Sequence, residues 1–334
     1  MNDVKKIPLI ASEVTGLWKS YMISSMLVSI MKYFLNHVEC EEIRGVLQEC
    51  LDISNEHIKD LTIFFNEEEL SIPDGISDSD VNINAPRLFT DSFYLQYLGF
   101  IARFALHNYA LILNHIARSD IRDYFSKCIN MNVEFFNHSA NVRLSMGVFI
   151  RAPRIDVPKE VQYVKAQSFI YDWFGEKRPL LTCEITHIFS IVVSNIVGRA
   201  ITTGFGQVSK IKKNSDFFFE GKSVASKQIG ELTSLLTDEG IPIPSTSDSC
   251  VTDSTIAPFS EKLMMIHTAA LASSGIGNLG IAIADNMRSD LQAKYIKYVS
   301  EDIKYAKHGT DILIDNGWLE QPPQAIKHEN LVQF

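Results

Sequence analysis

The amino-acid sequence predicts an all-α fold of two tandem four-helix bundles. Three observations lead to this prediction: the 334-residue chain repeats itself after about 170 residues, apolar residues recur at helical spacing within each copy, and runs of alternating β-branched residues between hairpin turns are nearly absent. The hydrophobic content of 46% is typical of a globular protein and is enough for a core in each half.

The internal repeat is most visible in two short motifs. Arg118-Ser119-Asp120-Ile121 recurs as Arg288-Ser289-Asp290-Leu291 at an offset of 170, and Glu13-Val14-Thr15 recurs as Glu184-Ile185-Thr186 at an offset of 171. The matching pieces keep their order, and the gaps between them are single residues, which indicates a duplication rather than chance. A unit of this length is a domain rather than a solenoid repeat.

The repeat divides the chain into three expected segments. Residues 1–157 form the first bundle, residues 158–180 a connector, and residues 181–334 the second bundle. The stretch between Pro158 and Pro179 has no match upstream of the first copy, so we expect it to be a connector that packs on one or both bundles.

The helices of the first copy follow from the spacing of its apolar residues. The three-four pattern runs from Leu17 to Leu35 for the first helix and from Ile43 to Phe65 for the second. A third run extends from Arg87 to about Ile116, and a fourth from Ser119 to about Met146. Gly147 is placed to end the fourth helix, because a helix commonly ends on a glycine in the left-handed conformation.

A long loop separates the second and third helices of each copy. It covers Glu67–Pro86 in the first copy and Asp238–Ala257 in the second, and both loops are rich in Asp, Ser, Pro and Gly. A helix of about 28 residues is about 42 Å long, and about twenty extended residues can span that distance. The loop can therefore cross the whole bundle, which is the connection that ferritin-like folds use.

Charge and cysteine content exclude several classes of function. The net charge of −9 and the pI of about 5.5 disfavour binding to nucleic acid, which needs a basic face. The five cysteines are scattered and form no CxxC pair, which favours a reducing cytoplasm over a disulfide framework or a structural zinc site. The 22 residues from Leu263 to Ala284 carry no charge, and we interpret them as the buried central helix of a bundle rather than a membrane span.

A glycine-rich motif lies inside this uncharged stretch. Gly275-Ile276-Gly277-Asn278-Leu279-Gly280 has the GxGxxG pattern of dinucleotide-binding loops. The aligned stretch of the first copy, Phe104 to Asn114, contains no glycine, and a phosphate loop and a plain helix would then occupy equivalent places. We therefore interpret the glycines as small residues that allow close helix packing.

Two helical motifs could bind a metal. Glu184 and His187 form an ExxH motif, of which ferritin-like di-metal sites use two together with two further Glu. The chain has no second ExxH, because Gly16 occupies the position of the His in the first copy. The alternatives are a mononuclear Fe, Mn or Zn site at Glu184 and His187, or a His at a surface or helix end; no cofactor is the expectation. Glu134 and His138 could chelate at i, i+4 spacing, and a His near the helix C-terminal dipole is the simpler interpretation.

Charged residues at the helix starts keep their identity between the copies. Glu13, Arg118 and Asp120 correspond to Glu184, Arg288 and Asp290. If the long loop crosses the bundle, the first and fourth helices start at the same end, so we predict that Glu13 pairs with Arg118 and Glu184 with Arg288. The alternatives are a repeated clamp between helices and an anionic site that Asp290 and His187 join, and we favour the clamp because buried charges need partners.

Several longer motifs resemble a known family. These are the start SEVTGLWKSY, the stretch IPDGISDSDVN followed by APRLFTD, the RSDI and RSDL segments, APFSEKLMM and the terminal GWLEQPP. Together they resemble an uncharacterised family of spore-forming Firmicutes, a domain of unknown function whose members look like tandem ferritin-like bundles. The segment from RSDL to GWLEQPP is similar to the spore-coat F family. The resemblance implies the fold and implies no reaction.

Three functions remain open on the sequence. The first is a non-enzymatic structural or interaction protein of a spore former, located in the cytoplasm or with the spore, whose partner is an unidentified protein or the spore coat. The second is a metal-binding bundle or oxidase. The third is a bundle that binds a small molecule or lipid, because small residues in the third helices could leave a cavity. Neither nucleic acid nor a membrane is an expected partner.

Overall fold

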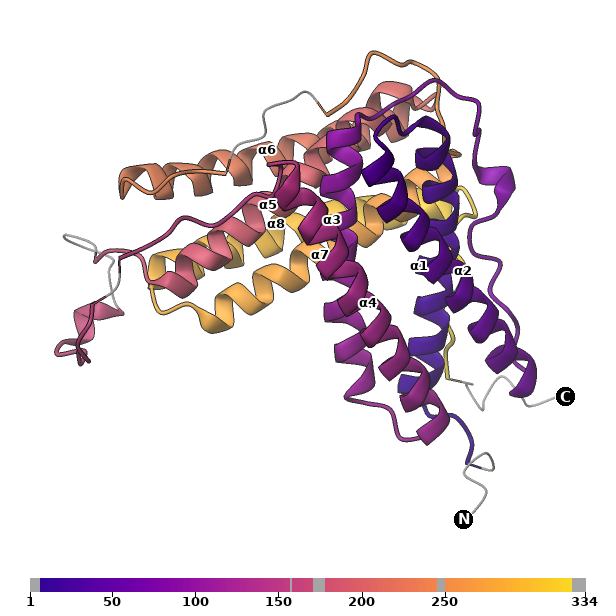
Figure 1. Cartoon of the computed structure of the whole chain (residues 1–334), viewed down its shortest axis with the longest axis horizontal. Coiled ribbons are helices and arrows are strands. Elements are labelled where there is room, and N and C mark those ends of the chain that lie inside the picture. The colour runs from indigo at the N-terminus through magenta and orange to yellow at the C-terminus, as the bar shows by residue number, and fades with distance from the viewer. Residues whose placement is uncertain (1–6, 157, 171–177, 245–249, 326–334) are drawn as a thin grey trace, which may run out of the picture.

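The computed structural model describes residues 7–156, 158–170, 178–244 and 250–325, and these residues confirm the all-α prediction. They contain eight α-helices, no β-strand and two isolated β-bridges (Figure 1). The helices are α1 (Ala11–His37), α2 (Glu41–Glu67), α3 (Asp91–Leu113), α4 (Ser119–Ser145), α5 (Thr182–Val208), α6 (Lys212–Asp238), α7 (Glu261–Asp285) and α8 (Ser289–Asp315).

Contacts at the helix starts establish the crossover topology of each bundle. The Asp91 carboxylate at the start of α3 accepts a hydrogen bond of 2.8 Å from the amide of Cys40 at the start of α2. Glu261 at the start of α7 accepts one of 2.8 Å from the amide of Lys210, just before α6. The second and third helices of each copy therefore start at the same end and run parallel. The long loop returns the chain along the bundle, as predicted.

The third helix starts later than its apolar pattern indicates. The pattern predicts a start at Arg87, whereas α3 begins at Asp91 after Thr90, whose side chain accepts from the amide of Phe93. Leu88 and Phe89 are extended, because their backbone pairs with the other copy: the amide of Thr252 donates to the carbonyl of Leu88 at 2.9 Å. A non-local contact thus replaces the first turn of the helix.

The two copies exchange these extended segments reciprocally. One antiparallel bridge joins Val81 to Phe259, and the other joins Phe89 to Val251. At the offset of 170, Val251 is the counterpart of Val81 and Phe259 is the counterpart of Phe89, so the two bridges are equivalent. Tyr97 lies at the centre of this arrangement, and its hydroxyl is 2.8 Å from Nε2 of His267, its own counterpart. The two bundles are therefore related by an approximate two-fold axis that passes near this pair.

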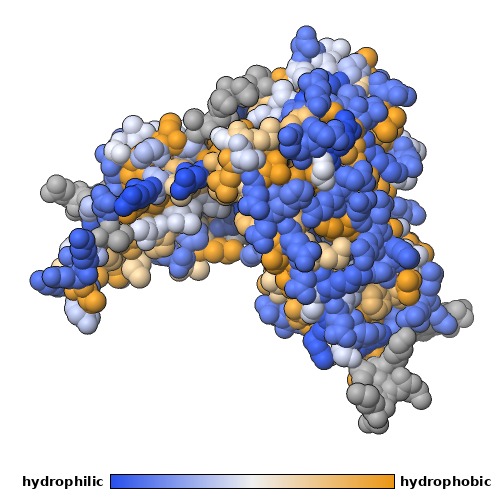
Figure 2. All heavy atoms as spheres, in the orientation of Figure 1, coloured by the Kyte–Doolittle hydropathy of each residue, from blue (hydrophilic) through white to orange (hydrophobic). Residues whose placement is uncertain are grey.

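The core is continuous between the bundles. One buried cluster contains residues of both copies, among them Phe34, Phe93, Phe205 and Met264. Two smaller clusters fill the outer parts of the bundles, one around Tyr124 in the first copy and one around Tyr295 in the second. The bundles meet at an angle, and Figure 2 shows them as two arms with a hollow between them.

Hydropathy singles out α5 and α7. Both are long and apolar enough to cross a membrane by composition, and 56% of the most apolar window is buried in α5 but only 22% in α7. The segment expected to be a buried central helix is thus only partly buried: most of its residues are buried or half-buried, and the exposed ones begin at Ser273. In this fold α5 and α7 pack against each other and against the other helices of the second bundle.

Candidate functional site: a cavity between the bundles

A large, mainly apolar cavity lies where the two bundles meet. Its volume is about 460 Å³, and its wall comes from α1, α3, α5 and α7, from the end of α8 and from the segment after α8. Large apolar side chains from both copies line it: Trp18, Met22, Phe104, Leu111, Ile266 and Trp318. The cavity therefore exists only because the two bundles are packed together.

Small residues of α7 leave the space for this cavity. Ile266, Ala269, Ala270, Ser273 and Gly277 follow helical spacing and form one stripe that faces the cavity. A Cβ atom added to Gly277 would meet nothing within 4 Å. The expectation that the glycines of the GxGxxG motif allow close helix packing is therefore wrong at Gly277 and Gly280, where the space is open, whereas a Cβ atom at Gly275 would lie 3.9 Å from the Asp302 carboxylate.

A few polar groups interrupt the apolar wall. Lys19, Arg103 and His107 line the cavity from the first copy, and Glu320 lines it from the segment after α8. The Glu320 carboxylate accepts a hydrogen bond of 3.2 Å from the amide of Gly75, which attaches this segment to the crossover of the first copy. The conspicuous GWLEQPP motif thus contributes to one wall of the cavity.

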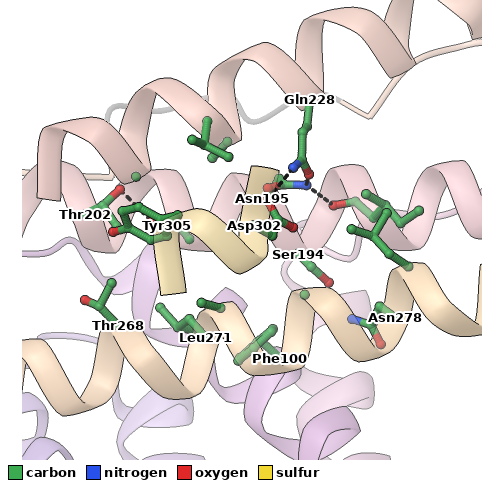
Figure 3. A pocket seen from close by; sticks show the side chains of 18 residues that line it. Phe100, Ser194, Asn195, Thr202, Gln228, Thr268, Leu271, Asn278, Asp302 and Tyr305 are labelled. Carbon is green, nitrogen blue, oxygen red and sulfur yellow. Dashed lines mark hydrogen bonds between the residues drawn. The ribbon is translucent and has the colours of Figure 1, made fainter. Parts of the chain in front are cut away.

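A smaller polar pocket lies inside the second bundle (Figure 3). Its volume is about 90 Å³, and it holds a hydrogen-bonded chain from three helices. The amide of Asn195 on α5 donates to Gln228 on α6 at 3.0 Å, and the amide of Gln228 donates to Asp302 on α8 at 2.8 Å. Burial raises the pKa of the Asp302 carboxyl from 3.8 to about 6.

The first bundle has a counterpart of this pocket at the same positions. Its volume is about 50 Å³, and Ser24, His57 and Asn132 replace Asn195, Gln228 and Asp302. The Nδ1 atom of His57 is 3.1 Å from the hydroxyl of Tyr109, and burial lowers the pKa of His57 to about 4. Each bundle therefore holds a few polar side chains in a mainly apolar pocket at its middle, and these side chains differ between the copies.

The residues of the predicted metal site have separate partners. Both oxygens of the buried Glu184 carboxylate accept from the Arg178 guanidinium, at 2.9 and 2.7 Å. His187 lies instead beside Asp285, with Nε2 to carboxylate oxygen at 2.8 Å. The described residues contain no group of three or more His, Cys, Asp or Glu that could hold a metal ion. Glu184 and His187 as placed do not fit an Fe, Mn or Zn site, because an arginine occupies the carboxylate.

The predicted ion pairs at the helix starts take a different form in the first copy. Glu13 accepts from the backbone amides of Ala117 and Arg118, at 2.9 and 2.8 Å. The Arg118 guanidinium instead binds Asp120 and Glu68, both at 2.7 Å. Ala117 and Arg118 lie just before α4, so their amides have no carbonyl partner within the helix, and the Glu13 carboxylate accepts from them.

In the second copy the same positions form a related clamp. Arg288 binds Asp290 and Glu239, both at 2.9 Å. The Glu184 carboxylate accepts hydrogen bonds from the Arg178 guanidinium of the connector, and this contact replaces the predicted pair with Arg288. In both copies the guanidinium joins the start of the fourth helix to the end of the second, which the sequence pattern did not indicate.

His138 belongs to another repeated contact. Its Nδ1 atom is 2.5 Å from the Glu49 carboxylate on α2, and His308 is 2.9 Å from Glu220 on α6. Both histidines thus join the second and fourth helices of their bundle. The suggested chelation by Glu134 and His138 does not explain this repetition, because the partner lies on another helix.

Comparison with known proteins identifies a family. The sequence model described as "Protein of unknown function (DUF3231)" matches residues 2–161 and again residues 168–331. No curated protein matches the chain. A crystal structure of a "putative spore coat protein" from Bacillus halodurans matches with 17% sequence identity and a TM-score of 0.42, covering 46% of this chain and 100% of that chain.

Proposed function

Because the chain belongs to the DUF3231 family, whose function is unknown, we propose a function from the cavity: the protein binds an apolar small molecule between its two bundles. The single observation that carries this proposal is the apolar cavity of about 460 Å³. Pockets for small molecules commonly have volumes of about 300–1,000 Å³, mostly apolar walls and a few polar groups.

The glycine of α7 supports the same proposal. Glycine in a helix interior costs about 0.5–1 kcal/mol relative to alanine. Gly277 contacts no neighbour that would exclude a side chain, so close packing does not account for it. An open volume at this position does account for it, since any larger residue would project into the cavity.

The test fills the cavity at Gly277. The full-length protein is titrated with N-phenyl-1-naphthylamine, a neutral apolar dye whose fluorescence rises in an apolar site. We expect the wild type to bind it and Gly277→Leu to raise its Kd at least tenfold, because the leucine occupies the space. Gly280→Leu is the matched control, since Gly280 lies on the same helix, has open space beside it and does not line the cavity.

Two results would contradict the proposal. One is a wild-type protein that does not bind the dye at micromolar concentration. The other is equal loss of binding in Gly277→Leu and Gly280→Leu, which would place the dye elsewhere or indicate a general loss of structure. Circular dichroism of both variants separates these last two cases.

We also propose that the protein acts in the spore. The similarity of the segment from RSDL to GWLEQPP to the spore-coat F family supports this location. A tagged copy followed through sporulation should appear in the developing spore. Expression restricted to vegetative cells would contradict it.

A further inference from the structure

Two arginines line a second cavity beside the first. This cavity has a volume of about 280 Å³ and lies between the first bundle and α5. Arg103 on α3 and Arg143 on α4 both line it, and the described residues of its wall include no Asp or Glu. Arg103 and Ser190 line both cavities, so the two spaces adjoin at these residues.

Arg143 is buried and has no carboxylate partner among the described residues. Arg143 is only 8% exposed, and its Nε atom donates a hydrogen bond of 3.2 Å to the carbonyl of Ser139. Within the described part of the chain, Nη2 has no hydrogen-bond partner. The guanidinium carbon lies 4.6 Å from the centre of the Phe149 ring, which orients the group without neutralising its charge.

The surroundings of Arg143 are shaped to admit it. A Cβ atom added to Gly99 would lie only 2.3 Å from Nη1 of Arg143, so this glycine gives the guanidinium its place across α3. Burial and the nearby charge of Arg103 lower the pKa of Arg143 to about 10. The guanidinium is thus charged at neutral pH, and a buried charge without a partner is costly.

The second copy shows that the scaffold does not require these arginines. At the offset of 170, Leu313 corresponds to Arg143, Ser273 to Arg103 and Ala269 to Gly99. The same helices pack there with neutral residues. The fold therefore does not explain two neighbouring positive charges in the first copy, and an anion that binds between them does.

We infer that Arg103 and Arg143 bind the carboxylate of an amphipathic ligand whose apolar chain occupies the larger cavity. A carboxylate accepts paired hydrogen bonds from a guanidinium, and the burial of Arg143 strengthens them. Arg103 lies at the junction of the two spaces, so one molecule can place its head in one and its chain in the other. This inference rests on the proposed function and names its ligand class, a medium-chain fatty acid.

The test compares an acid with its neutral analogue. Decanoate and 1-decanol each displace N-phenyl-1-naphthylamine from the full-length protein. We expect the wild type to bind decanoate at least tenfold more tightly than decanol. In Arg103→Ser/Arg143→Leu, which takes the residues of the second copy, we expect this preference to disappear. In Arg143→Leu alone, we expect the preference to fall while the Kd of the dye stays within twofold, because Arg143 does not line the larger cavity.

The controls separate this inference from the proposed function. If the wild type binds no dye, the proposed function fails; if it binds dye but prefers decanoate by less than twofold, only the carboxylate site fails. Inorganic phosphate at millimolar concentration is added separately, and displacement of decanoate by phosphate alone would contradict a carboxylate-specific head site. The single variant Arg143→Met keeps the test decisive if the double variant does not fold, because it removes the charge at similar volume.

Discussion

At the scale of single residues, the duplication provides a natural comparison at nearly every position. Asp302 occupies the polar pocket of the second bundle, and its counterpart in the first bundle is Asn132. Asn132 donates to the carbonyl of Cys128 at 2.8 Å and carries no charge. The second copy thus has an ionisable carboxyl group at the position where the first copy has a neutral amide.

This difference makes the stability of the protein depend on pH. The pKa of the Asp302 carboxyl is about 6 in the folded protein against an ordinary value of 3.8, so the folded state favours the protonated form. Below about pH 3.8 the group is neutral in both states and has no effect. As the pH rises through 6, the folded state must hold a buried carboxylate, and stability is lost.

We therefore predict that Asp302→Asn stabilises the protein above pH 6. The expected gain in the free energy of unfolding at pH 7.5 is between about 1 and 3 kcal/mol, and it should shrink toward zero near pH 4. Urea unfolding at a series of pH values measures it. Asp311→Asn on the exposed face of the same helix is the control, and a gain that does not vary with pH would refute the explanation.

At the scale of elements, helix positions were predictable because they depend on local spacing, whereas the partners of the charged residues were not. The sequence placed Arg118 at the start of α4 correctly and assigned it Glu13. The structure gives it Glu68, which follows α2, and Asp120. The repeat of this residue type at Glu239 could have revealed the contact, since both glutamates lie one residue beyond the second helix.

Removing the Arg118 guanidinium should weaken the contact between the end of α2 and the start of α4. The Arg118 side chain is 2% exposed, so Arg118→Ala leaves two carboxylates facing each other without a cation. We expect a loss of about 3 kcal/mol in the free energy of unfolding. The loss should diminish below pH 4, because Arg118 lowers the pKa of Asp120 and its contribution is lost as that group is protonated.

The exposed Arg122 provides the control for the clamp. Arg122→Ala, one turn further along α4, should change the free energy of unfolding by less than about 0.5 kcal/mol. Chemical denaturation of both variants at neutral pH gives the comparison. Similar losses in the two variants would show that helix propensity, rather than the buried contact, is responsible.

At the scale of the whole molecule, the sequence indicated two domains but not how they join. The offset of 170 follows from residue identities along the chain, whereas the exchanged segments and the cavity depend on packing between copies. Small residues on α7 were the available signal for the cavity, and the uncharged character of that helix was another. Neither indicates which face another bundle will cover, because that depends on contacts far apart in the sequence.

The shared core leads to a prediction about cooperativity. Two separate domains would unfold in two steps, but here the buried cluster around Phe34 and Phe205 belongs to both copies. The Tyr97–His267 pair lies within it, with both residues at most 3% exposed. We therefore expect a single thermal transition in which the calorimetric and van't Hoff enthalpies agree.

Tyr97→Phe tests whether this junction stabilises both bundles together. The variant leaves His267, whose Nδ1 has no partner among the described residues, without a hydrogen bond at Nε2 as well, at a cost of about 1–3 kcal/mol. Because burial holds the pKa of His267 at about 3, the ring is neutral and protonation at pH 7 does not relieve this cost. If the bundles unfold together, calorimetry should show one transition shifted to lower temperature; if they unfold independently, the trace should divide into two transitions, and the calorimetric enthalpy should be about twice the van't Hoff value.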